Sequence, residues 1–99
     1  MKKTAWIFSY KLKENVKKDY FIEQTKKLHD EIISKQKGFI SWEHFLDGEV
    51  WTDFVLWETE EDAKKATTAG QKNEITKKFY ACIDLKSCTA LISQLVKKY

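Results

Sequence analysis

The dipeptide Asp47-Gly48 is the feature that most constrains this chain, because it stands between two runs rich in aromatic and β-branched residues. Asp-Gly favours a two-residue hairpin turn, since a type I′ turn needs positive φ at both central positions. We therefore predict two antiparallel strands, Phe39 to Leu46 and Glu49 to Trp57. Counting outward from that turn predicts four cross-strand pairs: Leu46 with Glu49, His44 with Trp51, Trp42 with Asp53, and Ile40 with Val55.

Alternation along these strands gathers a candidate ligand site on one face of the hairpin. Its predicted members are Trp42, His44, Trp51 and Asp53, with Trp57 beyond them. Flat aromatic walls with a few polar groups are typical of small-molecule sites. His44 is a candidate catalytic acid or base near neutral pH, and Asp53 can orient a histidine or accept a ligand proton. The alternative is that the tryptophans fill a dimer interface. Phe39, Ser41, Glu43 and Phe45 are predicted on the opposite face.

The remaining elements follow from periodicity and end signals. Thr4 to Leu12 alternates like a strand, with apolar residues on both sides. Val16 to about Gln36 has helical spacing, with Asn15 as the predicted N-cap. A second helix is predicted from Thr59 to about Ala69, broken at Gly70 and restarted at Asn73 through Ile83. Ser87 to Val96 alternates like a last strand, although its end also suits a short helix.

This order, β-α-β-β-α-β, predicts a single α+β domain over residues 1–99, with the ferredoxin-like split unit and an antiparallel sheet. Both helices would cover one face of that sheet. Something else must cover the other, so we expect a homodimer whose sheets pair face to face.

Charge and composition exclude several classes of function. The net charge is +3, the 18 basic residues are all lysines, and acids stand beside them through most of the chain. A nucleic-acid binder usually has a concentrated basic face, so we expect no nucleic acid as partner. No apolar run approaches the roughly 20 residues that cross a bilayer, so no membrane is expected. The apolar run Ala5 to Phe8 is too short for a signal peptide, and we expect a cytoplasmic protein.

Residues outside the predicted site also carry groups capable of chemistry. His29, on the sheet-facing edge of the first helix, is a second candidate catalytic residue. Tyr10 and Tyr80 are candidates to line the same space. The two histidines lack paired spacing, and Cys82 and Cys88 match no zinc or redox motif, so no metal and no cofactor are expected. Glu43 reads either as an exposed edge residue or as a buried acid.

Several stretches resemble one family. They are the strand start Gly38-Phe39-Ile40-Ser41, the run Trp51-Thr52-Asp53-Phe54-Val55-Leu56-Trp57-Glu58-Thr59-Glu60-Glu61-Asp62-Ala63, and the segment Phe79 to Asp84. They look like the dimeric α/β-barrel superfamily and, within it, the antibiotic biosynthesis monooxygenase-like group. The resemblance implies ferredoxin-like protomers whose sheets pack into a barrel. Some members oxidise polycyclic aromatic compounds without metal or flavin, and others degrade haem or bind small molecules.

Differences between this sequence and the family's residue pattern narrow the range of functions that we expect. Haem-degrading members carry an Asn on the first strand, and a Trp and a His on the second helix. This chain has no Asn in that strand, and Ala66 and Thr76 stand near the two helical positions. Haem degradation is therefore not expected. Two functions remain open. One is a protein that binds a small aromatic or apolar ligand, in its catalytic form a cofactor-independent monooxygenase with His44 or His29 as base. The other is a non-catalytic binding or structural homodimer.

Overall fold

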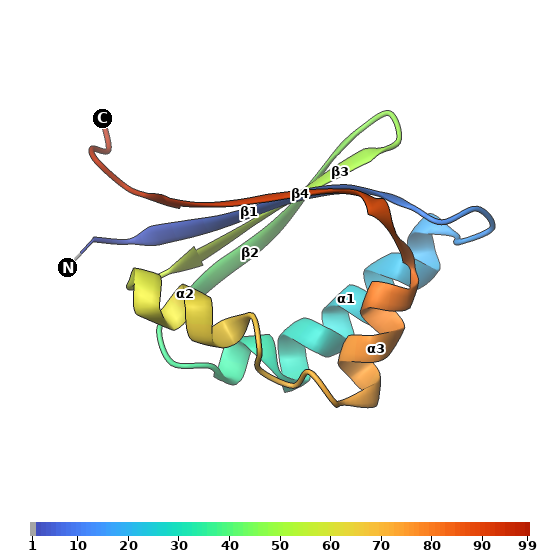
Figure 1. The fold of residues 1–99 in the computed structure, drawn as a ribbon, viewed down its shortest axis with the longest axis horizontal. Helices are drawn as coiled ribbons and strands as arrows, with labels where there is room; N and C mark the ends of the chain where they lie inside the picture. The colour runs from blue at the N-terminus through green and yellow to red at the C-terminus, as the bar shows by residue number, and fades with distance from the viewer. Residues whose placement is uncertain (1) are drawn as a thin grey trace.

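The structure, a computed structural model that describes residues 2–99, is a four-stranded antiparallel sheet with its helices on one face (Figure 1). The strands lie in the order β2-β3-β1-β4. Their bounds are β1 Thr4–Leu12, β2 Phe39–Asp47, β3 Val50–Trp57 and β4 Ile83–Gln94. The helices are α1 Lys18–Glu31, the 3₁₀ turn Ile33–Lys35, α2 Glu60–Ala66 and α3 Glu74–Ala81. The predicted α+β, ferredoxin-like architecture is confirmed.

The β2–β3 hairpin forms where it was predicted, but its register differs from the predicted one. Asp47 pairs with Val50, and Leu46 pairs with Trp51, two residues beyond Glu49. The central turn residues are Gly48 and Glu49, and Gly48 alone has a positive φ, at 60°. This is the pattern of a type II′ turn, which places glycine first, whereas the predicted type I′ turn would need Asp47 in the left-handed region.

The corrected pairs are His44 with Asp53 and Trp42 with Val55, in place of His44 with Trp51 and Trp42 with Asp53. Ile40 lies at a register shift between Phe39 and Ser41, so it does not pair with Val55. A shift of two residues leaves the side chains from Ser41 to Trp57 on their predicted faces, because side chains alternate with period two.

A bulge at Ile40 overturns the predicted face of Phe39. Phe39 pairs with Trp57, and their rings meet edge to face at 5.5 Å on the helix-covered side of the sheet. One extra residue in a strand reverses the alternation beyond it. Glu43, on the opposite face, is exposed in the protomer, so it is not a buried acid there.

The helix ends confirm some predictions and correct others. Thr59 Oγ1 accepts a hydrogen bond from the Asp62 amide at 3.0 Å, and Asn73 Oδ1 accepts one from the Ile75 amide at 2.8 Å. The break at Gly70 divides the predicted second helix into α2 and α3. Asn15, the predicted cap of α1, instead lies in a turn with φ of 70°, and Lys17 is the N-cap.

The last strand begins earlier than predicted. α3 ends at Ala81, and Ile83, fully buried, pairs with Leu12 of β1. Ile83 therefore opens β4 rather than closing a helix, and β4 ends at Gln94 without the alternative C-terminal helix. Within residues 2–99, none of the helices has the length and apolar character needed to cross a membrane.

Candidate functional site

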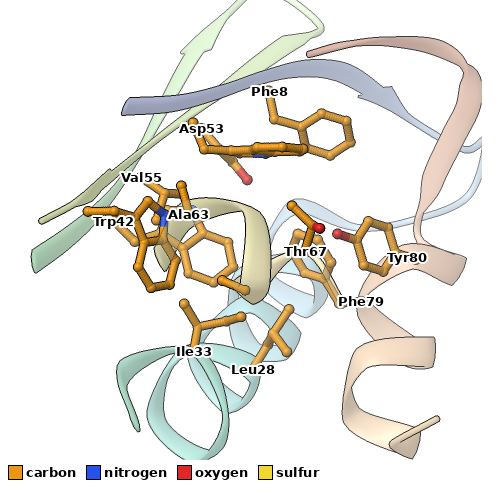
Figure 2. A pocket seen from close by; sticks show the side chains of 13 residues that line it. Phe8, Leu28, Ile33, Trp42, Asp53, Val55, Ala63, Thr67, Phe79 and Tyr80 are labelled. Atoms are coloured by element: carbon orange, nitrogen blue, oxygen red, sulfur yellow. The ribbon is translucent and has the colours of Figure 1, made fainter. Parts of the chain in front are cut away.

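A cavity of about 80 Å³ lies between the helix-covered face of the sheet and α2 (Figure 2). Its walls are mainly aromatic, and its helical side is formed partly by the small residues Ala63 and Ala66. The lining residues are Trp6, Phe8, Leu28, Ile33, Trp42, Asp53, Val55, Trp57, Ala63, Ala66, Thr67, Phe79 and Tyr80. Trp42, Asp53 and Trp57 of the predicted site are among them. Asp53 is the one member of this lining with a formal charge.

Asp53 is the chemical centre of the cavity. The residue is 2% exposed, and Figure 2 shows its carboxylate directed toward the enclosed space. Its Oδ1 accepts two hydrogen bonds, from the Tyr10 hydroxyl at 2.9 Å and from His44 Nδ1 at 2.5 Å. Two donors offset the cost of burying a carboxylate, and bonds to a charged acceptor are the stronger kind. Both bonds use one oxygen, so Oδ2 is left for a cavity ligand.

His44 supports Asp53 from outside the cavity lining. Its ring lies between Phe21, Trp42 and Trp51, with centroid distances of 5.5, 5.8 and 5.3 Å. Since a carboxylate oxygen only accepts, Nδ1 carries the proton in the bond to Asp53. Nε2 is buried and has no hydrogen-bond partner among the described residues. His44 is thus placed where its hydrogen bond can hold the Asp53 carboxylate in position.

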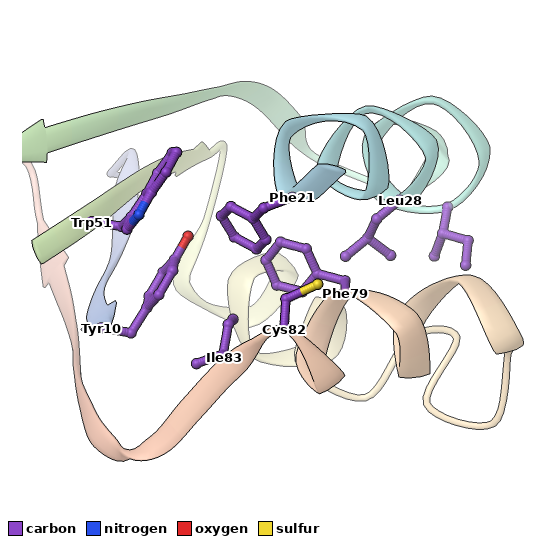
Figure 3. Close-up of a cluster of buried hydrophobic side chains, with 8 residues drawn as sticks. Tyr10, Phe21, Leu28, Trp51, Phe79, Cys82 and Ile83 are labelled. Carbon is purple, nitrogen blue, oxygen red and sulfur yellow. The ribbon is translucent and has the colours of Figure 1, made fainter. Parts of the chain in front are cut away.

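Tyr10 and Trp51, predicted to contact a ligand, do not line the cavity and belong to a cluster of buried hydrophobic side chains (Figure 3). Tyr10 is 1% exposed, and burial together with the nearby Asp53 charge raises the pKa of its hydroxyl far above the ordinary value. The hydroxyl therefore stays protonated and keeps donating to Asp53. Trp51 is buried against Phe21, with ring centroids 5.0 Å apart.

Trp42 contributes both an apolar wall and an unused donor. Its indole lines the cavity, and Nε1 is buried without a hydrogen-bond partner among the described residues. A buried N–H without an acceptor is unfavourable, so a ligand or water acceptor here would be stabilised. The cavity therefore offers Asp53 as acceptor and Trp42 as donor.

His29 does not reach this cavity. Its side chain is 38% exposed, and Nδ1 bonds the exposed carboxylate of its neighbour Asp30 at 2.7 Å. The ring contacts the edges of Phe39 and Trp42 from outside, at centroid distances of 5.3 and 6.5 Å. The structure brings His44 to Asp53 and leaves His29 at the surface of α1.

Sequence reasoning did not assign Trp6, Phe8, Ala63, Ala66 or Phe79 to the site. Trp6 and Phe8 were recognisable as one apolar side of β1, but only the strand order places β1 beside β3. The spacing of Ala63 and Ala66 puts them on one helix face, which was the available signal. Tyr80, an expected lining residue, does line the cavity. Burial, with Asp53 second, raises the pKa of Tyr80 above its ordinary value.

The face of the sheet without helices is also apolar. Phe45 and Leu91 are 54% and 52% exposed on it, and Ile7, Phe54 and Leu56 are half-buried between them. Polar residues interrupt this surface, including a bond of 2.9 Å between the hydroxyls of Ser9 and Thr52. Exposed apolar surface of this kind marks interaction sites.

Among residues 2–99, no group of three or more His, Cys, Asp or Glu side chains is arranged to hold a metal.

Comparison with known proteins supports the fold resemblance. No protein family model and no curated protein matches this sequence. Among solved structures, a candidate antibiotic biosynthesis monooxygenase from Bordetella bronchiseptica superposes with a TM-score of 0.79 at 14% identity, covering 98% of this chain and 100% of its own. A conserved protein from Methanosarcina mazei Go1 gives 0.74 at 21% identity, over 94% of this chain and 92% of its own.

A third solved structure, SnoaB from Streptomyces nogalater, is described as a cofactor-independent oxygenase. It superposes with a TM-score of 0.72 at 8% identity, covering 100% of this chain and 96% of its own. The predicted resemblance to antibiotic biosynthesis monooxygenase-like proteins is therefore confirmed at the level of the protomer fold.

Proposed function

We propose that this protein binds a flat aromatic molecule in the cavity and removes a proton from it with Asp53. The observation that carries the proposal is a carboxylate, 2% exposed and held by two donors, in a cavity walled by tryptophan and phenylalanine. Aromatic walls exclude water and select flat ligands, and a fixed carboxylate orients an acidic O–H or C–H group toward itself.

The proposed reaction is a cofactor-independent oxygenation. A ring-activated methylene, as in an anthrone, loses a proton to Asp53, and the resulting carbanion supplies the electrons that reduce oxygen. The carbon–oxygen bond then forms as a hydroperoxide, which loses water to leave a ketone. The net change is R₂CH₂ + O₂ → R₂C=O + H₂O, which needs no other reductant. The fold shared with SnoaB supports this chemistry by analogy alone.

His44 and Tyr10 have a positioning role in this proposal. The predicted role of His44 as the base is replaced by one in which it holds Asp53 through Nδ1, because Asp53, not His44, lines the cavity. His29 takes no part in the proposed step. Removing the His44 ring frees the carboxylate to rotate, and misplacing a catalytic group by a small distance lowers the rate steeply.

Oxygen consumption with 1,8-dihydroxy-9-anthrone, corrected for its spontaneous oxidation, tests the proposal. We expect Asp53→Asn to lose about 100-fold or more of the protein-dependent rate, since a general base contributes on this scale. The matched control is Asp47→Asn, in the exposed turn of the same hairpin, which should keep the rate. Equal rates for the wild type and Asp53→Asn would refute the base assignment. Tight binding without protein-dependent oxidation would favour the non-catalytic alternative.

We further propose that the helix-free face pairs with a second copy of this chain. Its exposed apolar side chains, Phe45 and Leu91 among them, support this, since a small domain gains stability from covering such a surface. Sedimentation at micromolar concentration should give a dimer, and Phe45→Glu should shift it to a monomer. A wild-type monomer would overturn this proposal and leave the cavity proposal standing.

A further inference from the structure

A second cavity of about 320 Å³ opens beside the first, between α1 and the α2–α3 connection. The two cavities share part of their lining, so they adjoin rather than lie in separate regions. The shared residues are Leu28, Ile33, Ala66, Thr67 and Tyr80. The outer cavity adds Ala69, Gln71, Thr76 and Lys77. A ligand held at Asp53 therefore has room to extend toward α3.

The two cavities carry opposite charge. Asp53 is the one formally charged residue that lines the inner cavity, and Lys77 is the one that lines the outer cavity. A ligand with a proton donor at one end and an anion at the other would match both. A ligand with its anion at the inner end would be repelled by the buried carboxylate.

Thr76 lines the outer cavity and carries a hydroxyl without a hydrogen-bond partner among the described residues. The residue is 8% exposed, and its Oγ1 is buried with no partner among the described residues. Gly70 packs against this hydroxyl, since a Cβ on Gly70 would lie 3.1 Å from that oxygen. A buried hydroxyl without a partner is unfavourable, and a ligand acceptor within reach would satisfy it.

Lys77 is free to turn toward the same ligand. Its ammonium lies 3.6 Å from Glu74, but the two side chains are 58% and 77% exposed. An ion pair this exposed contributes little to stability, so exchanging Glu74 for a ligand carboxylate is inexpensive. Thr76 and Lys77 are consecutive residues of α3, and both line the outer cavity.

We propose that the outer cavity is a subsite for the anionic end of the ligand, with Thr76 and Lys77 as its donors. The ligand class is then an aromatic compound with an acidic O–H or C–H group at one end and a carboxylate at the other. This inference rests on the proposed function, because it takes the inner cavity as the site of the aromatic ring.

Two probes that differ by a single carboxylate, 2-naphthol and 6-hydroxy-2-naphthoate, test this subsite by calorimetric titration. The wild type should bind the naphthoate about tenfold more tightly than the naphthol, because a hydroxyl and an ammonium both gain an anionic acceptor. Thr76→Val should lower naphthoate affinity about tenfold, and Lys77→Gln about two- to fivefold. Both variants should bind 2-naphthol as the wild type does, and Thr76→Ser should restore naphthoate binding.

The matched control is Lys64→Gln. Lys64 forms the same kind of exposed ion pair, at 3.3 Å from Glu60, and lines neither cavity. The Lys64→Gln variant should bind 2-naphthol and 6-hydroxy-2-naphthoate with the affinities of the wild type. Equal binding of the two probes by the wild type, or an equal loss of both probes in Thr76→Val and Lys77→Gln, would overturn the anionic subsite alone. Failure of the wild type to bind either probe would overturn the proposed function with it.

Discussion

The two ends of the helix-covered sheet surface differ in the size of the side chains that the helices place on them. At the end beneath α1 and α3, here called the closed end, Phe21 and Phe79 stack with ring centroids 5.2 Å apart over Tyr10 and Trp51. At the end beneath α2, the open end, the helix contributes Ala63 and Ala66 against Val55 and Trp57. Alanines leave space over a sheet that phenylalanines fill, and the inner cavity lies beneath Ala63 and Ala66, with Leu28 and Phe79 on its wall toward the closed end.

Asp53 stands at the border between these ends. Its carboxylate lines the open end, while both of its donors, Tyr10 and His44, are held among the rings of the closed end. Close packing limits the motion of those donors. A site whose supporting side chains are already held in place loses less conformational entropy when a ligand binds. One sheet surface thus carries a buried aromatic cluster at one end and a cavity beside small side chains at the other.

The largest expected effect comes from emptying the closed end. Phe21→Ala should lower the free energy of unfolding by about 3–5 kcal/mol, as is usual for a fully buried phenylalanine in a close-packed core. Urea unfolding measures it. Ile22→Ala, at the next position of α1 and 41% exposed, should cost less than about 1 kcal/mol. Comparable losses for the two variants would mean that the closed end is not tightly packed.

Enlarging one small residue at each end should affect the two ends differently. Cys82→Leu, at a 3% exposed position of the closed end, should cost about 1–3 kcal/mol because no space receives the added atoms. Ala66→Leu, beside both cavities, should change stability by less than about 1 kcal/mol and weaken 2-naphthol binding at least about tenfold. Unfolding and titration measure the two effects. The reverse order of stability losses would contradict the distinction.

Strain in the hairpin turn should affect both ends together. Gly48→Val should cost about 1 kcal/mol or more, since a β-branched residue at φ of 60° is strained. Apart from its two chain neighbours, no described residue has an atom within 4 Å of the position that a Cβ would take, so the expected loss comes from backbone strain. Glu49→Val, at the neighbouring turn position without positive φ, is the control. The expected urea midpoint is lower for Gly48→Val than for Glu49→Val, and equal midpoints would exclude turn strain.

The smallest expected effect is in the pH dependence of stability. Burial raises the pKa of Tyr10 at the closed end above that of an unfolded chain. The folded protein therefore holds a proton that the unfolded chain releases, and stability falls as pH rises above about 10. Tyr10→Phe should lose less stability between pH about 9 and about 11 than the wild type in urea unfolding. An unchanged slope would show that Tyr10 contributes nothing to it.

Local signals in the sequence predicted β1, the hairpin, the break at Gly70 and the helix starts at Thr59 and Asn73, because each is decided by neighbouring residues. They also predicted that Trp42, His44, Trp51 and Asp53 share a face. These signals could not predict the cross-strand partner of each residue. Gly48 suits the first central position of a type II′ turn as well as the second central position of a type I′ turn. The bulge at Ile40 and the α2 wall of the cavity depend on packing between distant segments.

The two-residue register difference has a consequence for the chemistry of Asp53. In a type I′ register Trp42 would stand opposite Asp53, on the same face, where His44 stands now. The type of turn sets the register and so decides whether an imidazole or an indole stands opposite the carboxylate. Redesigning positions 47 to 49 to favour a type I′ turn would exchange one for the other while Trp42, His44 and Asp53 stay unchanged. The ring that stands opposite this buried carboxylate therefore depends on the conformation of the turn at Gly48 and Glu49.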